Sequence, residues 1–86
     1  MDKTPEAARL LAEAEADHRA GRLAAAADGY RLLLANHGDV ADLHVNLGAA
    51  LKGLGKTRAA EESYRRALAL DAESLAGHFN LANLLR

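Results

Sequence analysis

Residues 44–48 of the chain read HVNLG, and residues 78–82 read HFNLA. Both stretches have the composition of a helix, yet each contains an asparagine, a poor helix former whose side chain competes for backbone hydrogen bonds. Asn46 and Asn80 are 34 residues apart. The return of the same unusual residue in the same local sequence indicates an internal repeat.

The 34-residue period extends over the rest of the chain. When the sequence is compared with itself at this offset, 13 of 52 positions are identical, which is about twice the number that the composition predicts by chance. The identical pairs of less common residue types are Gly21 with Gly55, Tyr30 with Tyr64, His44 with His78 and Asn46 with Asn80. We predict one domain over residues 1–86, with repeats at about 7–40 and 41–74 and a half repeat at about 75–86.

Composition limits the class of protein. A chain of 86 residues has room for one small domain, and its richness in Ala and Leu favours helices, so we predict an all-α fold. Without cysteine there is no disulfide or thiolate metal site, and the first residues lack the apolar core of a signal peptide, so a cytoplasmic location is expected. With 11 basic and 12 acidic side chains, neither nucleic acid nor a membrane is an expected partner.

Local signals divide the chain into five helices. We expect them at about 5–20, 22–36, 39–53 and 57–70, with a fifth helix running from about residue 71 or 74 to the end of the chain. Gly21 and Gly55 are placed as helix-ending glycines. The expected N-terminal caps are Thr4, Asp39 and Thr57, with Asp71 and Ser74 as alternatives for the last helix. Short connections of this kind make successive helices pack as antiparallel neighbours.

These residues resemble the tetratricopeptide repeat (TPR) family. The second period carries the clearest match, through Leu47-Gly48, Gly55, Ala60, Tyr64 and the segment ALALD at 67–71. The resemblance implies a right-handed αα-superhelix of about two and a half repeats. Two features depart from the family pattern. Histidine occupies the usual position of a large aromatic residue early in the first helix of the second period, and the usual proline between repeats is absent.

By this resemblance, the first helix of each pair lines a concave surface that binds an extended peptide. The spacing of Asn46 and Asn80 is similar to the asparagine ladder of the O-GlcNAc transferase repeats and related bacterial proteins, in which an amide can pair with a peptide backbone as donor and acceptor. The residues expected to bind the peptide are Leu11, Val45, Asn46, Ala49, Lys52, Phe79, Asn80 and Asn83. The alternative is that the two asparagines hydrogen-bond within the chain and only fix its packing.

A second function arises from the last predicted helix. Leu81, Leu84 and Leu85 form an apolar surface, and the sequence stops before the partner helix that would cover it in a complete repeat. Something should bury this surface. We therefore also consider self-association through these residues, as a homodimer or by exchange of the terminal helix, and continuation into a longer repeat array or a larger enzyme.

Motifs for chemistry are few. The segment ALKGLGKT at 50–57 imitates a phosphate-binding loop, but a helix is predicted where that loop requires a strand. His44 and His78 share a helical position in adjacent repeats, without an evident third metal ligand. We identify no catalytic residue, metal site or cofactor site, and we predict a non-catalytic scaffold for protein or peptide ligands.

Overall fold

The computed structural model describes residues 5–86, which form five α-helices and no strand. The helices are α1 (Pro5–Arg19), α2 (Leu23–His37), α3 (Ala41–Gly53), α4 (Thr57–Leu70) and α5 (Leu75–Leu84). The prediction of an all-α fold with five helices is confirmed, and the predicted boundaries of α1, α2 and α4 agree within one residue. None of the helices in this part of the chain combines the length and the apolar character needed to cross a lipid bilayer.

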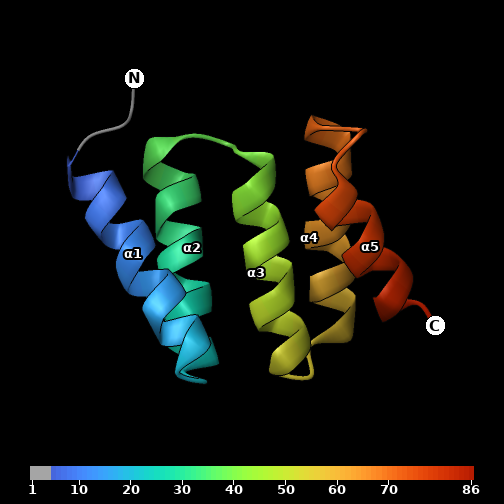
Figure 1. Cartoon of the computed structure of the whole chain (residues 1–86), viewed down its shortest axis with the longest axis horizontal. Helices are drawn as coiled ribbons and strands as arrows, with labels where there is room; N and C mark the ends of the chain where they lie inside the picture. The colour runs from blue at the N-terminus through green and yellow to red at the C-terminus, as the bar shows by residue number, and fades with distance from the viewer. Residues whose placement is uncertain (1–4) are drawn as a thin grey trace.

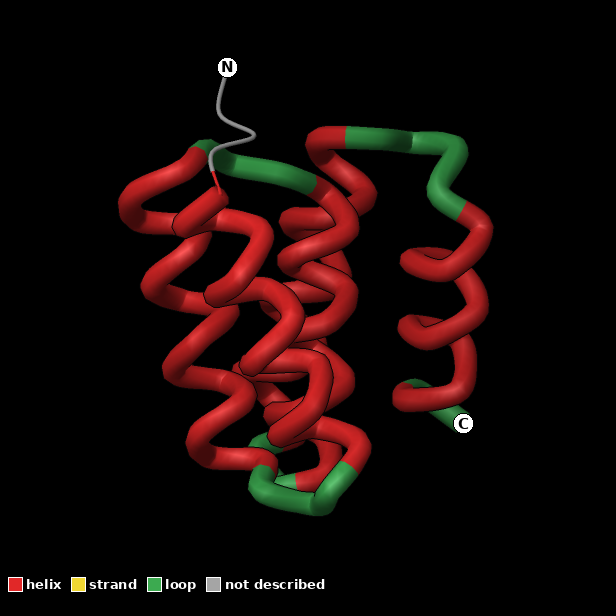
Figure 2. Tube along the Cα trace, turned by 60° about the vertical axis from the view of Figure 1, so that its left-hand side comes forward, coloured by secondary structure: helices red, strands yellow, loops and turns green. Residues whose placement is uncertain are grey.

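Successive helices run in alternating directions and pack against one another in chain order (Figure 1). The contacts between α3 and α4 are the most extensive, α2 lies against α3, and α5 contacts both α4 and α3. By contrast, α1 packs on α2 without an extensive backbone contact to α3. The α1–α2 and α3–α4 turns lie at one end of the molecule, whereas residues 38–40 and 71–74 connect helices at the other end (Figure 2).

The α1–α2 and α3–α4 turns have the same structure, and each is closed by a glycine in the left-handed region. Gly21 has φ 84° and Gly55 has φ 80°, a conformation that costs glycine little. In the first turn, the N–H of Gly21 donates to the carbonyl of His18 at 3.0 Å, and that of Arg22 donates to the carbonyl of Asp17 at 2.8 Å.

The second turn repeats this pattern with Gly55 and Lys56, which donate to the carbonyls of Lys52 and Leu51, both at 2.9 Å. Both turns are therefore Schellman motifs, as the two glycines predicted.

The helix starts agree less well with the sequence predictions. Ser74 does cap α5, because its Oγ accepts a hydrogen bond from the N–H of Gly77 at 2.9 Å. The prediction of Asp39 and Thr57 as caps was wrong. Val40 and Lys56 occupy the N-cap positions of α3 and α4, and neither makes a side-chain capping hydrogen bond.

The reason for the start of α4 is local. Lys56 closes the Schellman motif and is also the N-cap of α4, so Thr57 falls inside the helix. The predicted cap Thr4 lies outside the described residues. The last helix also stops short of the predicted end, because α5 ends at Leu84 and Leu85 is its C-cap.

Small residues allow the helices of each pair to approach closely. A Cβ atom at Gly48 of α3 would lie 2.5 Å from Cε1 of the buried Tyr64 of α4, and one at Gly29 of α2 would lie 2.9 Å from Cβ of Ala14 of α1. The short residue is therefore on the first helix in one pair and on the second helix in the other. In both cases, a side chain of one helix occupies the space that a larger residue would need.

The core contains two tyrosines at equivalent positions of the repeat, but only one has a hydrogen-bond partner. The Tyr30 hydroxyl shares a hydrogen bond of 3.1 Å with Nδ1 of His18. The Tyr64 hydroxyl is buried and has no partner within residues 5–86. Position 52, which is equivalent to position 18 in the second repeat, holds an exposed lysine. Burial raises the pKa of both phenols.

We expect Tyr64→Phe to raise the free energy of unfolding by about 1 kcal/mol or more, because it removes a buried hydroxyl that lost its water without gaining a partner. Tyr30→Phe is the matched control and should lower it by about 1 kcal/mol, because His18 then loses its bond. Urea unfolding followed by circular dichroism measures both changes. Equal destabilisation by the two substitutions would contradict the difference that the structure shows between the hydroxyls.

Candidate functional site

The main candidate site is a groove of about 630 Å³. It opens where α1 stands away from α3, with the C-terminal part of α2, the loop before α3 and the first turns of α5 completing its walls. The lining residues are Ala7, Ala8, Leu11, Glu15, Leu33, His37, Val40, Asp42, Leu43, Val45, Asn46 and Ala76.

The groove is mainly apolar. Leu33 and Val45 are buried, with 3% and 7% of their surfaces exposed, and Leu11 and Leu43 are half-buried beside them. Leu33 and Val45 thus form the floor, while Leu11, Leu43 and the exposed Val40 provide the hydrophobic surface that an aliphatic side chain of a ligand could cover. Because α1 and α3 form opposite sides of the opening, a ligand would contact both repeats at once.

Asn46 supplies a side-chain amide to this apolar surface. It is half-buried in α3, and within residues 5–86 its side chain makes no hydrogen bond. A primary amide presents two N–H donors and a carbonyl acceptor, which can pair with the C=O and N–H of an extended peptide. The donor and acceptor groups of Asn46 are therefore free for an external ligand.

Asn80 has a different environment although it is equivalent in the repeat. Its Nδ2 donates to the backbone carbonyl of Ala76 at 2.8 Å, one turn earlier in α5, and the residue does not line the groove. A local bond of this kind is a common alternative for asparagine within helices. The two asparagines are consequently not presented side by side in one groove.

The other predicted peptide-binding residues divide in the same way. Leu11 and Val45 line the groove, whereas Ala49, Lys52, Phe79 and Asn83 lie outside it. Asn83 accepts a hydrogen bond of 3.1 Å from Arg86. Sequence reasoning did not select several lining residues, namely Ala7, Leu33, His37, Val40 and Leu43. Their place in the lining depends on how α1, α2, the following loop and α3 pack together, and no local sequence motif indicates that packing.

The apolar surface of α5 differs from the one expected. Leu81 belongs to the core with 9% of its surface exposed, and Leu84 packs against that core. Leu85 remains 54% exposed, and it is accompanied by Phe79 at 68% and Leu75 at 85%. We call Leu75, Phe79 and Leu85 the α5 apolar face. Leu81 is thus buried by the chain's own helices and is not available to a second copy.

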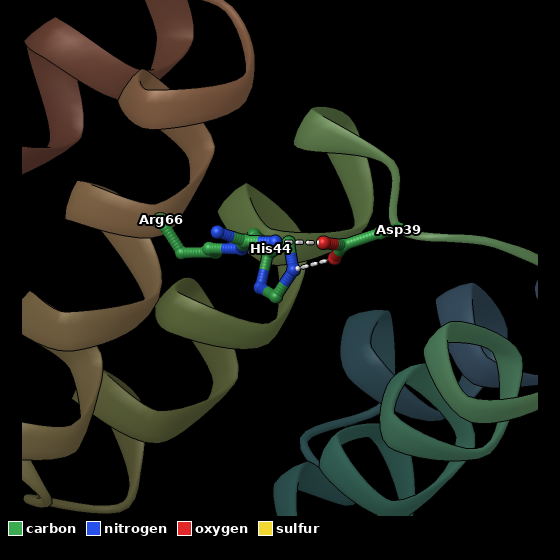
Figure 3. A network of polar contacts seen from close by, with 3 residues as sticks. All are labelled: Asp39, His44 and Arg66. Atoms are coloured by element: carbon green, nitrogen blue, oxygen red, sulfur yellow. Dashed lines mark hydrogen bonds and ion pairs between the residues drawn. The ribbon is translucent and has the colours of Figure 1, made fainter.

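A polar network ties the loop before α3 to the adjacent helices (Figure 3). His44 Nε2 donates to Oδ1 of Asp39 at 2.6 Å, and Arg66 of α4 donates to the other carboxylate oxygen. The hydrogen bonds from His44 and, second, from Arg66 lower the pKa of the Asp39 carboxyl. Asp39 therefore connects three segments instead of capping α3, and it holds the loop that carries the groove residue Val40.

The remaining chemical motifs have local structural roles. In the segment 50–57, the amides of Gly55 and Lys56 bond to helix carbonyls, so they do not converge on an anion as they would in a phosphate-binding loop. His78 Nε2 bonds to the carbonyl of Ala72 at 2.8 Å, whereas His44 bonds to Asp39. Among residues 5–86, no group of three or more His, Asp or Glu side chains is placed to hold a metal ion.

Comparison with known proteins adds no relative. No family model, no curated protein and no solved structure matches the chain.

The lowered pKa of Asp39 predicts a pH dependence of stability. Its contribution is complete above the ordinary pKa of 3.8 and is lost as the pH falls through the lower value of the folded state. Between pH 5 and about pH 3, the parent should therefore lose stability more steeply than Asp39→Asn, with a difference that shrinks in 0.5 M NaCl. Urea unfolding at each pH measures this.

The control is Asp28→Asn, which removes a carboxylate from the exposed surface of α2. It should keep the pH profile of the parent. Parallel profiles for the parent and Asp39→Asn would refute a stabilising role of the network.

Proposed function

We propose that the chain is a non-catalytic interaction module of the tetratricopeptide type, which binds an extended peptide or protein segment in the groove between α1 and α3. Support for the TPR-type superhelix comes from the 34-residue period together with the two identical glycine turns. Support for ligand binding comes from one observation above all, the half-buried Asn46 amide without an internal partner at the edge of an apolar groove.

The recognition mechanism combines a general and a selective part. The Asn46 amide pairs with the backbone of the ligand, which every peptide possesses, while Leu11, Val40 and Leu43 contact one aliphatic side chain. Asn80 lies outside the groove, and one of its two Nδ2 donors is occupied by the Ala76 carbonyl, so it contributes less to this recognition. Recognition through one amide and a short groove predicts modest affinity.

A peptide array tests this proposal. Peptides that bind the parent should bind Asn46→Ala about tenfold more weakly, because both hydrogen bonds to the ligand backbone are lost. The matched control is Asn36→Ala, which changes an exposed asparagine of α2 outside the groove and should leave binding unchanged. The proposal fails if no peptide binds the parent, or if Asn46→Ala retains full affinity while its helical circular dichroism equals that of the parent.

The α5 apolar face supports self-association as a second candidate function. Leu75, Phe79 and Leu85 are each more than half exposed, and burying them against a second copy would remove apolar surface from water. Light scattering should then show a dimer that dissociates in Phe79→Ser. The control is Leu32→Ser, which changes an exposed leucine of α2 and should leave the dimer intact. A parent chain that remains monomeric at high concentration excludes this function.

A further inference from the structure

The charges at the groove are all of one sign apart from a single imidazole. Glu15 lies on the α1 side and Asp42 on the α3 side, and His37 is the only other titratable residue that the described part of the chain contributes to the lining. Within residues 5–86, neither carboxylate forms an ion pair and no lysine or arginine lines the groove. Even with His37 protonated, the opening carries a net negative charge.

Unlike Glu15 and Asp42, several other carboxylates of the chain are paired with arginine side chains. Asp39 is neutralised by Arg66, and Glu61 accepts from Arg65 at 2.8 Å, so their charges are already compensated. Arg19 lies one turn beyond Glu15 on α1 but is exposed, forms no ion pair with it and does not line the groove. The groove is therefore complementary to a cation that must come from the ligand.

We propose that the ligand is an extended segment of another protein in which Lys or Arg lies two residues from an aliphatic side chain. This inference rests on the proposed function and specifies its ligand. Residues i and i+2 of an extended chain point to the same side, so both side chains can enter the groove together. The aliphatic side chain covers the accessible parts of Leu11 and Leu43, and the methylene stem of the basic residue follows the apolar wall while its charge reaches Glu15 or Asp42.

The negative charge of the groove also argues against anionic partners. Phosphate groups of nucleic acids and of lipid surfaces would meet two carboxylates and, among the residues described, no lysine or arginine at the groove, so electrostatics disfavours both. An acidic peptide is disfavoured for the same reason. A basic, partly aliphatic peptide satisfies the charge and the apolar surface at once.

Three peptides of one design test the inference by NMR titration of the parent chain. Each is a short Ala/Ser peptide with one central Leu, and the residues two positions before and after it are both Lys, both Gln or both Glu. The Lys peptide should bind roughly two- to fivefold more tightly than the Gln peptide for each carboxylate engaged, the Glu peptide should bind most weakly, and 0.5 M NaCl should reduce the preference.

The double variant Glu15→Gln, Asp42→Asn should bind the Lys and Gln peptides equally. The matched control is Glu13→Gln, Asp28→Asn, which removes the same charges outside the groove and should retain the preference for Lys. Equal binding of all three peptides to the parent, or a preference that survives in the double variant, would overturn the inference and leave the proposed function standing.

Two further results would count against the proposed ligand: the absence of any binding, and occupation of the groove by a second copy of the chain. If none of the three peptides shifts the groove resonances, the inference fails, and the peptide array decides separately whether the proposed peptide-binding function stands. If the parent is a dimer that the Glu15→Gln, Asp42→Asn variant converts to a monomer, the groove is occupied by a second copy of this chain, which overturns the assignment of a separate basic ligand.

Discussion

The contact between Gly48 and the ring of Tyr64 determines how closely α3 and α4 approach, and the other helices are arranged around that pair. Tyr64 fills the space where any larger residue at position 48 would extend, so the two helices meet with little free volume. From this pair, α2 packs on one side of α3, and α5 returns to contact both α3 and α4. The α3–α4 pair is therefore the scaffold on which the rest of the described structure is built.

The groove is a consequence of the same arrangement. α5 contacts α3, whereas α1 is held by α2 and stands away from α3. The space that remains is lined by apolar side chains from α1, α2, α3 and α5 and by the loop that the network of Asp39, His44 and Arg66 fixes. The candidate binding site therefore exists because α1 stands away from α3, and not because of a specialised sequence motif.

Much of the local structure could be predicted because it depends on neighbours in the chain. Gly21 and Gly55 end helices because glycine adopts a positive φ at low cost, and the hydroxyl of Ser74 reaches an amide three residues away. Asp39 was misassigned as a cap for the opposite reason. Its partners include Arg66, which is distant in sequence, and the ion pair with that side chain could not be inferred from the residues around position 39.

The sequence by itself determined five helices, their turns and the repeated positions of Tyr30, Tyr64, Asn46 and Asn80. Only the tertiary structure decided that Asn46 faces a groove with its amide unpaired, that Asn80 bonds to its own helix, and that Leu81 is buried. The physical reason is the range of the interactions. Helix formation and chain reversal follow from contacts within a few residues, whereas exposure, burial and the presence of both Glu15 and Asp42 in the lining of one groove depend on how separate helices stack.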